Sequence, residues 1–339
     1  MKILLIISLL SLNFVGYSQS DVHIIHNQNK VKYDTLRIKD YSQSLSLWTY
    51  SIEQLYKLEL RNQDNNKILK LSPNGQTNIG LGFNYKWMGL GIAFKPPFSG
   101  NDDDIYGKTK RIDAQFNVFS RSFGMDMSLQ YYKGFYVENP KDFIKTWDKE
   151  DYPKLSDLET LSMEVSAYYF TNHKKFSYRA AFVRNEVQLK GAGSPIFGVY
   201  ARTDIANIPG GVIPQDLPDS LKSDFDINGY ISNNYGFSFG YTYTFVIWKK
   251  FFINLSLVPG FGIKTIKAFT NKGSYIPSAG LSGRIVGRSA IGYEHKYFYL
   301  GISQISITNN FSYENLKFST STTKVRFFIG KRFSFDKKK

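Results

Sequence analysis

Residues 235–245 read YGFSFGYTYTF: an aromatic residue occupies every second position, and glycine, serine or threonine fills the positions between. Side chains of a β-strand point alternately to its two faces, so this repeat predicts a strand with one aromatic and one small, polar face. Four earlier stretches repeat the pattern: 77–86, 88–95, 111–119 and 122–133. Alternation alone does not distinguish a soluble sandwich from a membrane barrel, since the strands of both have one apolar face.

The N-terminus predicts export. Lys2 precedes a mostly apolar run at 3–15, and Gly16 and Ser18 supply the small residues that a signal peptidase requires before its cut. We therefore expect a signal peptide at 1–18. The chain has no cysteine, which excludes a lipidated N-terminal cysteine, disulfide bonds and thiol catalysis.

No later stretch approaches the roughly 18 uninterrupted apolar residues of a membrane-spanning helix. If the exported protein lies in a membrane, it must be a closed β-barrel, the other structure that satisfies every backbone group in lipid. The 24 Tyr, 28 Phe and 27 Gly, combined with a negative mean hydropathy, are typical of such barrels. The predicted fold class is therefore all-β: an antiparallel transmembrane β-barrel of about 12–14 strands.

The remaining chain is expected to form a polar periplasmic lead-in at 19–40 and a single β-barrel domain at 41–335. Within the barrel, residues 206–221 are rich in proline and glycine and predict a loop. This loop either forms a mobile rim or folds into the lumen or over its mouth. Around 184–233 the sequence does not show which residues point inward.

Face matching predicts three hairpins. A turn at 86–87 places Tyr85 opposite Met88, and a turn at 120–121 places Val118 opposite Phe123. A third turn, at 172–173, places Tyr169 opposite Phe176, Ala167 opposite Tyr178 and Ser166 opposite Arg179.

Several short motifs occur in an order that resembles a known family. They are Leu71-Ser-Pro-Asn-Gly75, Gly80-Leu-Gly-Phe83, Phe176-Ser-Tyr-Arg-Ala-Ala181, Gly191-Ala-Gly-Ser194, Tyr241-Thr-Tyr-Thr-Phe245, Leu257-Val-Pro-Gly260 and Gly330-Lys-Arg-Phe333. Over about residues 30–335 the chain resembles the Bacteroidetes-type domain of unknown function 4421. The resemblance implies an exported, barrel-like protein and brings no known activity or catalytic residue.

The formal net charge of +15 falls by one when Lys2 leaves with the signal peptide. Export and the scatter of Lys and Arg through the loops argue against nucleic-acid binding, the usual interpretation of a basic chain. We expect the barrel to contact outer-membrane lipids, including their anionic headgroups. The sequence identifies no protein partner.

The polar strand faces predict a charged network in the lumen, formed by Arg111, Asp113, Asp126, Glu164, Arg179, Arg284 and Arg326. Buried charges are usually paired, so one interpretation is a salt-bridged plug that closes the lumen. The alternative is an arginine-lined pore for anions, in which the charges set selectivity.

No catalytic, cofactor-binding or metal-binding residues are predicted. His23 and His26 lie in the lead-in, and His173 and His295 lie at or beside turns, so none shares a strand face with a serine. The acidic run 101–104 lacks the spaced ligands of a calcium loop. We predict a non-catalytic outer-membrane barrel, either structural or a narrow transport or binding barrel; the alternatives are an outer-membrane lipid hydrolase and a soluble periplasmic β-rich binding protein.

Overall fold

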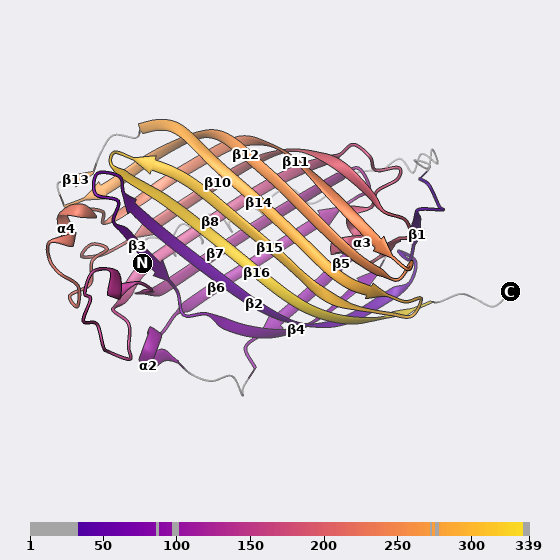
Figure 1. Ribbon diagram of the computed structural model, residues 1–339, viewed down its shortest axis with the longest axis horizontal. Helices are drawn as coiled ribbons and strands as arrows, with labels where there is room; N and C mark the ends of the chain where they lie inside the picture. Colours follow the sequence, from indigo (N-terminus) through magenta and orange to yellow (C-terminus); the bar gives the residue numbers. More distant parts are fainter. Residues whose placement is uncertain (1–32, 86–87, 97–101, 272, 275–277, 335–339) are drawn as a thin grey trace, which may run out of the picture. The chain divides into compact units, whose positions relative to one another are not determined.

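The computed structural model describes residues 33–85, 88–96, 102–271, 273–274 and 278–334 and is built mainly of strands (Figure 1). The strands are β1 (Ile38–Asp40), β2 (Leu45–Asn62), β3 (Ile68–Ser72), β4 (Gln76–Tyr85), β5 (Met88–Phe94), β6 (Lys110–Phe119), β7 (Phe123–Val137), β8 (Lys154–Phe170), β9 (Glu186–Gln188), β10 (Ala192–Asn207), β11 (Gly229–Ile247), β12 (Phe251–Thr270), β13 (Gly273–Ser274), β14 (Ser278–Glu294), β15 (Phe298–Tyr313) and β16 (Leu316–Phe333). The helical turns are α2 (Asp103–Tyr106), η1 (Pro140–Asp142), α3 (Tyr178–Phe182) and α4 (Leu221–Asp224).

The predicted signal peptide, 1–18, lies outside the described residues. The predicted lead-in is described only from residue 33 onward and contains β1, which pairs with β9 in a separate two-stranded sheet. Across the described part of the chain, no helix is long and apolar enough to cross a membrane.

The wall of the barrel is one antiparallel sheet, which joins fourteen of the described strands. It closes because β16 pairs with β2 over the whole length of both strands, from Phe333 opposite Leu45 to Leu316 opposite Asn62. Around one end the closed ring runs through ten strands: β2, β3, β7, β8, β10, β11, β12, β14, β15 and β16. The predicted fold class, an antiparallel barrel of about 12–14 strands, is confirmed.

Away from that end, the ring is interrupted. β3 covers only one end of β2 and of β7; beyond it, β2 pairs with β4, and β7 pairs with β6. β7 changes partner near Gly134, where its register to β8 also shifts, as at a β-bulge. Among the described residues, β5 pairs only with β4, and β6 only with β7. We call this break in the wall, between the free edges of β5 and β6, the seam.

The alternating pattern places aromatic side chains on the outer wall. In β11, Phe237, Phe239 and Tyr241 are exposed, whereas Ser238 and Thr242 are buried inside. Phe116, Met127 and Val165, which lie on the apolar faces of β6, β7 and β8, are exposed as well. So large an apolar exterior is typical of a barrel that spans a bilayer.

Two of the three predicted hairpins form. Tyr85 lies opposite Met88, as predicted. β6 and β7 also pair, but Val118 lies opposite Met125 instead of Phe123. The cause is a longer turn, in which the backbone N–H of Ser120 donates to the carbonyl of Phe123 at 2.8 Å. Because the shift is two residues, every side chain keeps its predicted face.

The third predicted hairpin is wrong. β8 pairs with β10, where Tyr169 lies opposite Phe197, and residues 171–191 between them form an insertion that holds α3 and β9. Ser177 caps α3 by accepting a hydrogen bond from the Ala180 backbone N–H at 3.0 Å. Tyr178 stacks on Phe170 with ring centres 4.5 Å apart, so packing against the barrel overrides the strand-like alternation.

Two segments fill the lumen towards opposite ends, where Figure 1 shows α4 and α3. The first, 208–227, packs apolar side chains against the inner wall, with Val212, Leu217 and Phe225 all buried. We call it the α4 plug; of the two alternatives for the proline-rich loop, the folded-in one is correct. The second is the insertion 171–191, which packs against inner residues of β10, β12 and β14. We call it the α3 plug.

Candidate functional site

The lumen between the two plugs is crossed by ion pairs. On β8, Leu158 packs with the α4 plug and Tyr168 with the α3 plug, and Glu164 lies between them. Glu164 pairs with Arg284 of β14 and with Arg202 of β10, whose Nη1 lies 3.1 Å from its Oε2. Because β10, β11 and β12 separate β8 from β14 around the wall, the Arg284 pair joins opposite sides of the barrel.

Further pairs neutralise the other inward carboxylates. Arg202 binds Asp204 through Nε and Nη2, at 2.8 and 2.6 Å. Arg288 of β14 pairs with Asp126 of β7, again across the lumen.

Asp113 of β6 accepts from Lys324 Nζ of β16 at 2.8 Å and from Gln130 Nε2 at 3.1 Å. This lysine reaches across the side of the barrel that contains the seam. Each of these carboxylates therefore has a cationic partner, as the cost of desolvating a charge requires.

A chamber of about 250 Å³ lies next to these pairs. Four cationic side chains line it: Arg184, Arg288, Lys324 and Arg326. None of the described residues around it is Asp or Glu. Arg288 and Lys324 have the carboxylate partners given above, whereas Arg184 and Arg326 have no described carboxylate within 4.0 Å. The chamber therefore carries excess positive charge.

Aromatic rings surround the two arginines that lack a carboxylate. The guanidinium of Arg326 lies 5.0 Å from the ring centre of Tyr50 and 5.7 Å from that of Trp48. The guanidinium of Arg184 lies 4.2 Å from the ring of Phe328. Burial lowers the pKa of Arg184 to about 10, so it stays charged at neutral pH. Ring faces attract a cation but occupy few of its N–H donors, and the buried Nε of Arg326 has no hydrogen-bond partner among the described residues.

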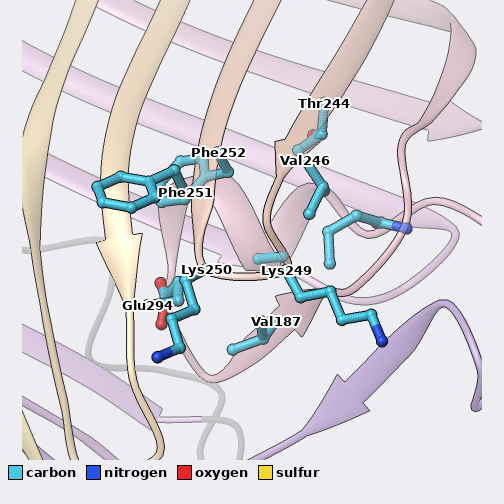
Figure 2. A pocket seen from close by; sticks show the side chains of 10 residues that line it. Val187, Thr244, Val246, Lys249, Lys250, Phe251, Phe252 and Glu294 are labelled. Atoms are coloured by element: carbon cyan, nitrogen blue, oxygen red, sulfur yellow. The ribbon is translucent and has the colours of Figure 1, made fainter.

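A second hollow lies beside the turn between β11 and β12. Figure 2 shows Lys249 and Lys250 of this turn, together with Val187, Phe252 and Glu294 around the same space. Its volume is about 10 Å³, which is room for about one water molecule. We therefore assign no ligand to it.

Six of the residues predicted for the lumen lie on the inner face of strands: Arg111, Asp113, Asp126, Glu164, Arg284 and Arg326. The structure brings Glu164 and Arg284 into contact, and Arg111 Nη2 donates to Asn78 Oδ1 at 3.1 Å. Arg179 is the exception. It lies in α3, where its Nη1 is 3.1 Å from Glu186 Oε1, so its predicted place on a strand face is wrong.

Sequence reasoning missed four members of the network: Arg184, Arg202, Arg288 and Lys324. Arg288 and Lys324 share the parity of the predicted Arg284 and Arg326 on the same strands, which could have identified them. The inward orientation of Arg202 can be predicted from the alternation of β10, but only once the 171–191 insertion is recognised. Arg184 lies in that insertion, and no pattern in the sequence indicates its position.

A family model described as "Domain of unknown function (DUF4421)" matches residues 32–333. No curated protein matches the sequence. Among solved structures, the outer membrane protease OmpT from Escherichia coli is similar, with 8% identity, a TM-score of 0.40 and coverage of 87% of this chain and 98% of that one. The toluene transporter TodX from P. putida has 8% identity, a TM-score of 0.24 and coverage of 88% of this chain and 94% of that one. The outer membrane protein OprG from Pseudomonas aeruginosa has 9% identity, a TM-score of 0.23 and coverage of 87% of this chain and 98% of that one. At such low TM-scores and identities, these likenesses carry no argument about what this chain binds or does.

Proposed function

The chain belongs to the DUF4421 family, a family named for its unknown function, and we propose that this member is a non-catalytic outer-membrane β-barrel whose lumen is closed along its axis. The observation that carries the closed lumen is the set of ion pairs that join opposite walls, above all Arg284 with Glu164. The two plugs support it, because their apolar side chains pack against the inner wall on either side of these pairs.

The outer-membrane location is supported by the exposed aromatic exterior and by the predicted signal peptide. We expect the barrel to remain in the membrane fraction until detergent is added, and to migrate differently on gels before and after heating. We also expect its basic loops to contact anionic headgroups. A protein released by osmotic shock without detergent would instead be a soluble periplasmic β-protein.

Planar-bilayer recording tests the closed lumen. We expect the purified wild-type barrel to give no channels, and a variant that lacks residues 175–190 and 211–226, with each gap joined by a short glycine linker, to conduct. The deletion variant must keep its heat-modifiable mobility, which shows that the wall still forms. Wild-type channels selective for anions would overturn the closed lumen in favour of an arginine-lined pore.

The proposed lack of catalysis is supported by the surroundings of the described histidines. His173 Nδ1 lies 3.1 Å from the carbonyl oxygen of Phe170, and His295 Nδ1 accepts from the backbone N–H of Tyr297; among the described residues, neither histidine has a hydrogen bond to a serine hydroxyl. Purified protein should release no product from lipid esters or peptides. Turnover that is lost on substituting His173 or His295 would identify a hydrolase.

A further inference from the structure

Beside the seam, described residues are exposed on both faces of the wall. On the outer face, Leu90 of β5 and Phe116 of β6 are 55% and 56% exposed. On the inner face, their neighbours Gly91 and Gln115 are exposed too, whereas an inward residue of the continuous wall, such as Ser238, is buried. Lipid cannot satisfy the backbone groups of a free strand edge. At the seam, the unpaired backbone groups of β5 and β6 therefore need water or a polar ligand, which the chamber can supply.

The chamber opens onto the seam. Its lining includes Leu90 and Phe116, whose side chains belong to the outer face, and also Arg184 and Arg326, which belong to the interior. The chamber thus extends from the cationic interior to the two edge strands β5 and β6 at the seam. Entry from this side does not require passage through either plug.

The chemistry of this space changes along its length. At the seam, Leu90 and Phe116 present apolar surface; inside, Arg326 offers a guanidinium that no described carboxylate neutralises. A buried guanidinium without an anion is unfavourable, and carboxylate or phosphate oxygens match its planar array of donors. The interior therefore fits an anion, and the seam fits a hydrocarbon chain.

The volume of the chamber limits how much of a ligand it can hold. Sites for whole drug-sized ligands have volumes of about 300 to 1,000 Å³, and this chamber measures about 250 Å³. An anionic headgroup fits inside it only if the attached chain remains outside, between the strands and in the bilayer. We propose that the chamber binds the carboxylate or phosphate headgroup of a membrane amphiphile that enters sideways through the seam, with Arg326 as its main anchor. This site rests on the proposed membrane location and not on the closed lumen.

Calorimetric titration of the full chain in uncharged detergent tests the site. Sodium palmitate and dodecyl phosphate should bind, while hexadecanol, which lacks the charge, and acetate and inorganic phosphate, which lack the chain, should bind at least tenfold more weakly. Arg326→Gln should weaken palmitate binding about tenfold to a hundredfold, the usual contribution of a hydrogen bond to a charged group. Lys331→Gln removes the same charge from the exposed face of β16 and should leave binding unchanged.

Three results would overturn the proposal. Equal binding of hexadecanol and palmitate would show a site for chains alone, and equal binding of acetate and palmitate would show a site for free anions. Unchanged palmitate affinity in Arg326→Gln, in protein that keeps its heat-modifiable mobility, would remove the proposed anchor.

The route through the seam is tested by joining its edges. The chain has no cysteine, so Leu90→Cys with Phe116→Cys gives one reactive pair. A bismaleimide that links the two within one chain should slow palmitate binding at least tenfold, whereas each single variant, capped with a small maleimide, should bind nearly as the wild type does. Links formed between two copies instead would show that the seam is an interface between barrels, and unaltered binding after linkage within one chain would place the entry elsewhere.

The conductance of the same preparation separates this inference from the proposed function. If the barrel binds palmitate but conducts ions, the proposed headgroup site is supported and the proposed closed lumen is contradicted. If the barrel neither conducts ions nor binds palmitate, the closed lumen is supported and the headgroup site is contradicted.

Discussion

Replacing Glu164 with Gln removes the carboxylate that lies between Arg202 and Arg284. Glu164 is 5% exposed and Arg284 is 2% exposed, so the change leaves positive charge buried without its partner. We expect the free energy of unfolding to fall by about 3 to 5 kcal/mol. Urea unfolding of the detergent-folded barrel, followed by tryptophan fluorescence, measures it.

Lys149→Ala is the matched control. Lys149 pairs with Asp216 at 3.2 Å, but both side chains are half exposed, so the loss should stay below about 1 kcal/mol. If Glu164→Gln costs no more than this, the lumen pairs do not hold the walls together.

The sequence could identify which single side chains point inward, but not which of them meet. Alternation assigns Glu164 and Arg284 to inner faces, yet their contact depends on which strands face one another across the lumen. Arg179 illustrates the limit. Its neighbours alternate as in a strand, but the cap at Ser177 and the packing of Tyr178 place it in a helix.

Among the strands, the two faces should respond differently to charge. Phe239→Arg, at an outward position of β11 that is 56% exposed, should destabilise a bilayer-embedded barrel by about 2 to 4 kcal/mol. Gln115→Arg, at an exposed inward position beside the seam, should cost less than about 1 kcal/mol. Unfolding in lipid vesicles compares them, and the opposite order would reverse our assignment of inside and outside.

Ser166 is an inward position to which the tolerance of Arg expected for Gln115 does not extend. Alternation alone predicts that an inward position accepts Arg as readily as Gln115 does. Ser166, however, is buried, and its Oγ donates to Glu164 and accepts from Arg284 Nη2, both at 3.1 Å. An added guanidinium there would meet Arg284 directly. Polar strand faces thus include both open and fully packed positions, which alternation does not distinguish.

The bulge in β7 makes a separate prediction about backbone shape. Gly134 has φ of +92°, and a Cβ there would lie 2.2 Å from the carbonyl oxygen of Lys108. Gly134→Ala should therefore cost about 1 to 3 kcal/mol. Gly287→Ala in β14 is the control, because nothing lies within 4 Å of its added Cβ, and it should be nearly neutral in the same urea unfolding assay. Equal stability of the two variants would argue against a strained bulge.

At the scale of the whole barrel, the sequence predicts the apolar outer surface but not the segments that fill the lumen. The bilayer imposes a repeat of two on every spanning strand, so the alternation can be recognised in the sequence. The plugs obey no such repeat, because segments such as 208–227 bury apolar side chains at irregular intervals against whatever inner wall lies nearby. The seam is equally hidden, since β5 and β6 alternate as well as the strands of the closed ring and differ from them only in pairing, among the described residues, on one side.

The pairing of β2 with β16 has a consequence for when the barrel can form. These strands come from opposite ends of the chain, and contacts between such distant segments are slow to form. The ring cannot close until β16 has been synthesised. A chain that stops before Leu316 would leave the edges of β2 and β15 open to other chains, and such edges promote aggregation. Pairing of β16 with β2 therefore sets the time of closure: the other strands can pair with their neighbours earlier, but the ring closes only when β16 is available.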